Sequence, residues 1–219
     1  MLNGGDCLLW VIGLAVLCLG VCLPTFLYHK AAFRYGLATA FKALGTLCAL
    51  VPALVAAIRL EPACYVCVIA LALHVIADIL IEYNLYWGSG FFLAGHLCYI
   101  AFFTKLFSIT AVHLICVLVL LAFTGFMFWR WRKAIGKQLV FFIVYGVFLC
   151  VMSTCAIAGG ITAHTTQGLL IALAGGFFYI SDGCLAFRLL YPTKPIINWI
   201  IMILYYIAQL LFGISCLLI

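Results

Sequence analysis

Apolar runs of about 20 residues follow one another along the chain, separated by short connections that carry charges, glycine or proline. A run of roughly this length is what a helix needs to cross the hydrocarbon core of a bilayer. No segment alternates polar and apolar residues as a membrane strand does, so helices are favoured over a barrel. The pattern predicts an all-α, polytopic membrane bundle of about eight transmembrane helices.

Turn-forming residues predict where these helices begin and end. Breaks are expected at Glu61-Pro62, Gly88-Ser89-Gly90, Gly159-Gly160 and the turn from Pro192 to Pro195. The predicted helices run over Cys7–Tyr28, Tyr35–Ile58, Ala63–Tyr83, Gly90–Thr104, Phe107–Phe128, Leu139–Ile161, Gly168–Leu190 and Pro195–Ile219. They leave no room for a soluble domain, so residues 1–219 are expected to form a single transmembrane domain.

The composition supports a membrane location. Hydrophobic residues make up 69% of the chain and charged residues 7%, and the mean hydropathy is +1.37. A soluble domain could not bury so much apolar surface. Most of the 12 cysteines lie within the apolar runs, which indicates small core residues rather than a disulfide framework. The cysteine and aromatic content favours the endoplasmic reticulum membrane.

Basic residues are distributed unevenly over the connections. The connections after the first, third, fifth and seventh helices hold Lys30, Arg34, Arg130, Arg132, Lys133, Lys137, Arg188 and Lys194, and the others hold Arg59 and Lys105. By the positive-inside rule the first set faces the cytosol, which places both termini on the lumenal or exterior side. The net charge of +6 is therefore a topology signal, and no nucleic-acid partner is expected.

A few ionisable residues interrupt the apolar runs. His74, Asp78 and Glu82 are spaced four residues apart, so they share one face of a helix. Such groups cost about 2.5 kcal/mol or more each at membrane depth, and a functional role is the default interpretation.

Other predicted helices each carry one strongly polar residue, namely Lys42, His96, Asp182 and Gln209. At about 1.5 Å per residue, Lys42, Asp78, His96 and Asp182 lie roughly 8 to 12 Å from the cytosolic end of their helices. A shared depth predicts a polar layer around a cavity that opens to the cytosolic leaflet.

Two carboxyl groups in a dehydrated cavity need not share a protonation state. Desolvation and mutual repulsion keep one protonated, while a cation such as Lys42 keeps the other ionised. One acid and one base suit hydrolysis of an acid-labile bond, and a cavity within the leaflet selects lipids as substrates.

Several alternatives remain open from the residues alone. Lys42 could form a purely structural ion pair, and His74 could be a core histidine. His74, Asp78, His96 and Asp182 could bind zinc, although we predict neither a metal nor a cofactor. A lipid or small-molecule transporter could use the same buried charges as a proton-coupled site. A homodimer is also left open.

The two halves of the chain echo one another. Asp78 precedes a helix with His96 and Tyr99, and Asp182 precedes a helix with Tyr206 and Gln209. Two repeats of four helices, related by an axis along the membrane normal, would place the two aspartates face to face across the cavity.

Five motifs occur along the chain in an order that is typical of one family. They are Lys42 in Phe41-Lys42-Ala43-Leu44, Asp78 in Ala77-Asp78-Ile79-Leu80, His96 and Tyr99 in Gly95-His96-Leu97-Cys98-Tyr99, Ser181-Asp182 after Gly175-Gly176, and Tyr206-Ile207-Ala208-Gln209. With these motifs the chain resembles the lysoplasmalogenase family of YhhN-like membrane proteins. It departs from the family pattern at Ala77, where a glycine is usual, and in having Gly45 and then Pro52 where a proline usually follows the lysine closely.

This resemblance implies hydrolysis of the vinyl-ether bond of lysoplasmalogens to a fatty aldehyde and glycerophosphoethanolamine or glycerophosphocholine. It also implies that Asp78 and Asp182 are the catalytic acid and base, in an order that the sequence does not decide. The residues expected to bind the substrate or orient the water are Lys42, His74, Glu82, His96, Tyr99, Ser181, Tyr206 and Gln209, and Arg188 is a further candidate for the phosphate.

Overall fold

The computed structural model describes residues 4–219, so the first three residues of the predicted domain lie outside the described part. Its long elements are helices, as predicted. They are α1 (Gly4–Val16), a π-helical stretch (Leu17–Cys22), α2 (Leu23–Ala31), α3 (Tyr35–Arg59), a 3-10 turn (Pro62–Cys64), α4 (Tyr65–Leu80), α5 (Leu85–Leu106), α6 (Ala111–Ile135), α7 (Leu139–Ala163), α8 (Thr166–Leu190) and α9 (Ile196–Ser215).

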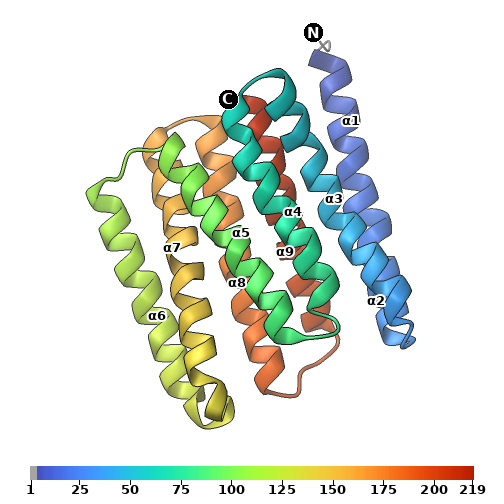
Figure 1. Ribbon diagram of the computed structural model, residues 1–219, viewed down its shortest axis with the longest axis vertical. Coiled ribbons are helices and arrows are strands. Elements are labelled where there is room, and N and C mark those ends of the chain that lie inside the picture. The colour runs from blue at the N-terminus through green and yellow to red at the C-terminus, as the bar shows by residue number, and fades with distance from the viewer. Residues whose placement is uncertain (1–3) are drawn as a thin grey trace.

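Seven continuous helical stretches among the described residues are long and apolar enough to cross a membrane. The longest spans 53 residues, Ala111–Ala163, and would be about 80 Å long if straight. It instead contains α6 and α7, which fold back as an antiparallel hairpin (Figure 1). The chain reverses at Gly136, whose φ of 57° is easily adopted by glycine. Counting the hairpin twice gives the eight predicted crossings.

Six of the helices form a closed ring. In order around the ring, α3 packs on α4, α4 on α5, α5 on α7, α7 on α8, α8 on α9, and α9 on α3. The α1–α2 rod lies outside against α3, and α6 lies outside against α7 (Figure 1). A half-turn exchanges α3 with α7, α4 with α8 and α5 with α9, which is the arrangement that the internal echo predicts. The helices that carry Asp78 and Asp182 therefore occupy opposite positions in the ring.

The first crossing stays continuous despite a proline in its second half. Pro24 has no N–H group, and its ring would collide with the carbonyl group of Gly20 in a regular helix. The backbone widens into the π-helical stretch immediately before this point, which accommodates the proline. The following helix, α2, is thereby directed so that Phe26 is buried and Lys30 reaches the ring.

Two of the predicted breaks are wrong. Helix α5 begins at Leu85 rather than Gly90, because the side-chain oxygen of Asn84 accepts hydrogen bonds from the N–H groups of Tyr86 (3.0 Å) and Trp87 (3.1 Å) and so caps the helix. The Gly159-Gly160 pair lies inside α7. Helix α6 is also displaced from its predicted range, running over Ala111–Ile135 instead of Phe107–Phe128.

The glycine pair allows two helices to touch instead of ending one. A Cβ atom on Gly160 would overlap the carbonyl oxygen of Gly168 in α8 and would lie 3.0 Å from the Cβ of Ala172. Small residues of this kind let transmembrane helices approach closely, since packing rather than the hydrophobic effect drives their association. The seam between α7 and α8 therefore depends on the absence of a side chain at Gly160.

The basic residues are divided unequally between the two ends of the bundle. The start of α1 and the C-terminus lie at the same end of the bundle (Figure 1), where α3 ends at Arg59 and α5 carries Lys105 in its last turn. The opposite end holds the connections that carry the larger set of basic residues. Which end faces the cytosol stays a prediction.

A Gly160→Ala substitution is expected to destabilise the bundle by about 1–3 kcal/mol, because the added methyl group has no space at the seam. Gly176→Ala in α8 is the matched control, since a Cβ atom there meets nothing within 4 Å. That control should be neutral or gain up to about 1 kcal/mol from helix propensity. Thermal unfolding of the purified proteins in detergent measures both. Equal melting temperatures for the two variants would contradict the proposed role of the seam.

Candidate active site

Asp78 of α4 and Asp182 of α8 line one cavity of about 130 Å³ in the half of the bundle that holds the basic connections. The helices bring together residues that are far apart in sequence, because α4 and α8 face each other across the ring. The other polar residues that line the cavity are Lys30, Lys42, Glu82, Ser181, Arg188, Asn198 and Tyr205.

Asp78 is fully buried and held by three donors. Its Oδ2 atom accepts hydrogen bonds from the hydroxyl groups of Thr46 (2.5 Å) and Tyr205 (2.8 Å). The Nζ atom of Lys42 lies 3.6 Å from its Oδ1 atom, which accepts no hydrogen bond from the described residues. Two hydroxyl donors and an ammonium group stabilise the carboxylate form, and they leave Oδ1 as the oxygen that a ligand or water can use.

Glu82 joins two lysines at the mouth of this cavity. It lies in the connection between α4 and α5, with Oε1 2.9 Å from Lys42 Nζ and Oε2 2.6 Å from Lys30 Nζ. Burial by itself would raise the pKa of Glu82, but the two ammonium groups outweigh burial and lower the pKa to about 2. Both lysines also lie over the ring of Phe26, at 5.3 and 5.7 Å. Glu82 thus ties α2, α3 and α4 together as a carboxylate.

Asp182 has different surroundings. The hydroxyl group of Tyr145 in α7 donates a 2.6 Å hydrogen bond to its Oδ2 atom, and the Nε2 atom of His96 in α5 lies 3.3 Å from the same hydroxyl group. No ammonium or guanidinium group of the described residues lies within ion-pair distance of Asp182. The two carboxyl groups therefore share a cavity but not an environment.

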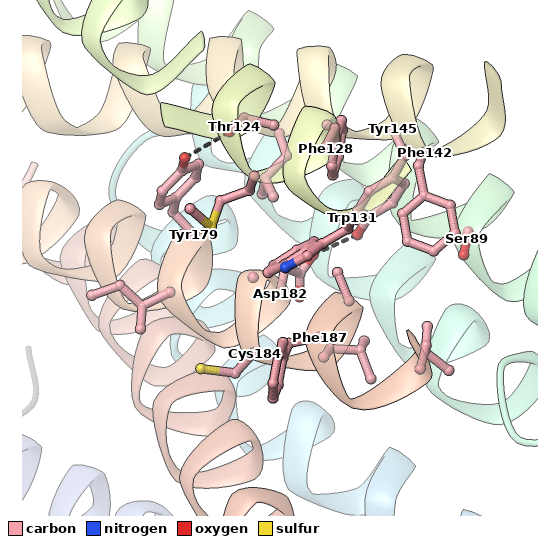
Figure 2. A pocket seen from close by; sticks show the side chains of 18 of the residues that line it. Ser89, Thr124, Phe128, Trp131, Phe142, Tyr145, Tyr179, Asp182, Cys184 and Phe187 are labelled. Atoms are coloured by element: carbon pink, nitrogen blue, oxygen red, sulfur yellow. Dashed lines mark hydrogen bonds between the residues drawn. The ribbon is translucent and has the colours of Figure 1, made fainter. Parts of the chain in front are cut away.

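A second, larger cavity of about 380 Å³ also reaches Asp182. It lies between α6, α7 and α8 and is lined almost entirely by apolar and aromatic side chains. Figure 2 shows Asp182 and Tyr145 facing each other at its wall, with the rings of Phe128, Trp131 and Phe142 around them. Asp182 is thus at the junction of a polar cavity and an apolar one.

Three predicted substrate-binding residues form a separate network. The Nε2 atom of Gln209 lies 2.6 Å from Nδ1 of His74, and the Tyr99 hydroxyl group donates to Oε1 of Gln209 at 3.0 Å. All three are fully buried and none lines the cavity of Asp78. A Cβ atom on Gly95 would overlap the His74 ring, so α4 and α5 are in close contact here. Their polar atoms link α4, α5 and α9, and a role for them in binding a substrate stays a prediction.

Two further predicted residues, Ser181 and Tyr206, donate hydrogen bonds to backbone carbonyl groups. Ser181 lines the cavity, but its hydroxyl group donates to the carbonyl oxygen of Ile201 (2.9 Å) and so joins α8 to α9. Tyr206 does not line the cavity and donates to the carbonyl oxygen of Lys42 (3.1 Å). The neighbouring Tyr205, which the motif did not include, is the tyrosine that contacts Asp78.

Some residues of the site were missed. Thr46 follows Lys42 by one helical turn and Tyr205 precedes Gln209 by one turn, so both signals were present in the spacing of four residues. Tyr145 and Asn198 carry no such signal, because neither carries a charge and neither is spaced four residues from another predicted site residue. Lys30 was assigned to topology alone, yet it also binds Glu82.

Among the described residues, no group of three or more histidine, cysteine, aspartate or glutamate side chains is placed to hold a metal ion. The four residues considered for zinc divide between separate hydrogen-bond networks, with His74 bound to Gln209 and Asp78 bound to Thr46. The 11 cysteines that the structure describes are unpaired thiols.

The fold and the cavity define a multi-pass integral membrane protein in which a buried carboxyl group, Asp78, and a half-buried one, Asp182, come from opposite helices of one ring. The model of the YhhN family matches residues 37–216, which is most of the chain, and the protein therefore belongs to the YhhN family. This family includes lysoplasmalogenases. Searches of the curated proteins and of the solved structures found no match. The matched residues contain the whole six-helix ring apart from the first residues of α3, and they exclude α1 and α2.

Glu82→Gln is expected to remove a stabilisation that depends on pH. The folded-state pKa of about 2 is below the ordinary value of 4.5, so the ionised Glu82 stabilises the fold above pH 4.5. This contribution, about 3 kcal/mol from the pKa difference, is lost as the pH falls from 4.5 towards 2. The difference in melting temperature between wild type and variant should therefore shrink over this range.

The matched control is Glu61→Gln at the other end of the bundle. Among the described residues Glu61 contacts no lysine or arginine, and its carboxylate accepts only the N–H group of Ala63 (3.1 Å). A difference between wild type and Glu82→Gln that stays constant down to pH 3 would show that the lysine pairs do not stabilise the fold.

Proposed function

We propose that this protein is a membrane-embedded lipid hydrolase of the endoplasmic reticulum that cleaves the vinyl-ether bond of lysoplasmalogens. The products are a fatty aldehyde and glycerophosphoethanolamine or glycerophosphocholine. The observation that carries the proposal is that two carboxyl groups in unlike environments line one cavity, at the edge of an apolar chamber. Membership of the YhhN family supports a hydrolase of this type.

The unlike environments support one assignment of the two roles. Asp182 accepts one hydrogen bond, from Tyr145, and has no cation beside it in the described structure, so it is the group that holds a proton. Asp78 has Lys42 and two hydroxyl donors, so it is the carboxylate that accepts a proton from water. An acid and a base at opposite sides of a cavity are what addition of water across a polarised double bond requires.

The reaction proceeds by proton transfer to carbon. Asp182 gives its proton to the alkenyl carbon that does not bear oxygen, and the other alkenyl carbon becomes part of an oxocarbenium ion. Water attacks that carbon and gives a proton to Asp78, which leaves a hemiacetal. Asp182 then takes the hemiacetal proton as the carbon–oxygen bond breaks, and Asp78 protonates the departing glycerol oxygen. Both carboxyl groups return to their starting states.

The head group has cationic partners at the mouth of the cavity. Arg188 donates a 2.6 Å hydrogen bond from Nη1 to the side-chain oxygen of Asn198, and it has no carboxylate partner among the described residues. Lys30 lies on the same cavity wall. A guanidinium group whose other donors are not used in an ion pair suits the phosphate of a glycerophospholipid.

A transporter would need a second polar site towards the other end of the bundle. Two polar residues of that end bind backbone atoms instead, with Thr162 donating to the carbonyl oxygen of Ala158 (2.8 Å) and Gln167 to that of Ser215 (3.2 Å). Asp182 lines both cavities, so a single reaction centre serves both of them. These observations favour the hydrolase over the transporter.

Asp78→Asn and Asp182→Asn should each lower aldehyde release from lysoplasmalogen by about 10²–10⁴-fold, the usual contribution of a positioned acid or base. The assay uses purified protein in detergent with excess substrate. Circular dichroism and the melting temperature establish that each variant is folded. Full activity in both variants would contradict the mechanism, and so would activity that is abolished by a metal chelator alone.

Arg188→Gln should raise the KM for lysoplasmalogen by about tenfold or more while leaving kcat within a fewfold, because a charge-assisted hydrogen bond contributes about 1.5–3 kcal/mol to binding. Arg132→Gln is the control, since Arg132 lies at the same end of the bundle and contacts Trp129. An equal KM for the two variants would show that Arg188 does not bind the head group. Steady-state kinetics over a range of substrate concentrations measures both parameters.

A further inference from the structure

We infer that the apolar chamber between α6, α7 and α8 holds the single hydrocarbon chain of an amphiphile whose head group occupies the polar cavity. This inference rests on the proposed function for the choice of substrate, and it assigns the chamber as the site that selects chain length. The observation behind it is the junction at Asp182, where the two cavities meet.

The two cavities share part of their walls. Ile81, Leu85, Asp182, Leu185 and Leu189 line both of them. A molecule that occupied both cavities would cross this common wall, to which Asp182 belongs. Among the shared residues Asp182 is the one with a chemically reactive side chain.

The linings of the two cavities differ in the way that the two ends of an amphiphile differ. The polar cavity has Lys30, Lys42 and Arg188 in its wall. The larger chamber has rings and aliphatic groups in its wall, including Phe123, Met127 and Phe128. A charged or strongly polar occupant would lose hydration in the chamber without finding partners.

Four polar side chains of the chamber wall bind one another in pairs, and Ser89 and Trp131 add two further donors. Tyr145 donates to Asp182, and the hydroxyl groups of Thr124 and Tyr179 lie 2.7 Å apart (Figure 2). Because these hydrogen bonds are internal, the chamber has little left to offer a polar ligand. A saturated chain needs no hydrogen-bond partner and is the occupant that such walls accept.

Helix α6 supplies the outer wall of the chamber. It stands outside the six-helix ring and packs chiefly on α7 (Figure 1). At the opposite side of the ring, α2 holds the corresponding outside position and contributes Lys30 and Phe26 to the polar cavity. The two helices outside the ring thus complete the two ends of one site, one for the head group and one for the chain.

A side chain can be added to the chamber without disturbing its frame. Gly183 of α8 lines the chamber, and a Cβ atom there meets nothing within 4 Å. A Gly183→Leu substitution would place a branched side chain in the space proposed for the chain. The control is Gly176→Leu, two helical turns earlier in α8, where a Cβ atom also meets nothing within 4 Å but which does not line the chamber.

The first test is photolabelling, which needs no catalysis. The probe is a lysophosphatidylcholine with a diazirine near the end of its acyl chain, added to the purified full-length protein in detergent, with labelled peptides identified by mass spectrometry. Label is expected on the wall formed by α6, to be strongly reduced in Gly183→Leu and to be unchanged in Gly176→Leu. Label that is absent from α6, or that is equal in the two variants, would overturn the inference.

The second test measures chain-length preference with saturated alkyl-ether lysophospholipids, which lack the vinyl-ether bond. These compounds compete with the photoprobe, and the wild-type protein should bind them up to about fourfold more tightly for each added methylene that enters the chamber. Gly183→Leu should lose about tenfold for the longest chains and little for the shortest. A chain-length profile identical to that of Gly176→Leu would overturn the inference.

The two proposals can fail separately. Chain-dependent labelling of α6 without aldehyde release from lysoplasmalogen would contradict the hydrolase and leave the chain site standing. Aldehyde release that depends on Asp78 and Asp182 but is insensitive to Gly183→Leu would support the hydrolase and contradict the chain site.

Discussion

The ion-pair cluster of Lys42, Asp78 and Glu82 is the constraint on which the rest of the structure depends. Charges at membrane depth are tolerated only when they are paired and hydrogen-bonded, and removing one partner would leave the other uncompensated. The cluster fixes α3 against α4, and Lys30 extends it to α2. The cluster also accounts for the polar cavity that its three residues line, because paired charged groups exclude lipid chains from the space beside them. The remaining ring helices close around this centre.

The two halves of the ring have the same arrangement of helices, but the side chains beside the two aspartates differ. In one half, α3 gives Asp78 an ammonium group and a hydroxyl donor, through Lys42 and Thr46. In the other half, the equivalent helix α7 gives Asp182 the hydroxyl group of Tyr145. A symmetrical scaffold with unlike neighbours gives the two carboxyl groups different surroundings, since the difference lies in a few side chains rather than in the backbone.

The spans and the polar layer could be predicted from the sequence because the bilayer imposes length and because buried charge is rare. Lys42, Asp78 and Asp182 stood out for that reason, and they do line one cavity. The direction of individual side chains was harder. Tyr205 and Tyr206 are neighbours in the sequence, and only the rotation of α9 decides which of them meets Asp78. Glycine was ambiguous in a different way, because Gly160 could end a helix or admit a close neighbour, and the second proved correct.

The contact of α7 with α8 through Gly160 has a consequence for how molecules move through this protein. Two helices whose backbones touch cannot slide easily, so Tyr145 and Asp182 are presented by a rigid pair. Helix α6 packs mainly on one partner, α7, and forms the outer wall. In the proposed reaction the aldehyde would then depart sideways past α6 into the bilayer, while the glycerophospho fragment would depart through the charged mouth into water. A hydrolase built in this way delivers its two products to two different phases.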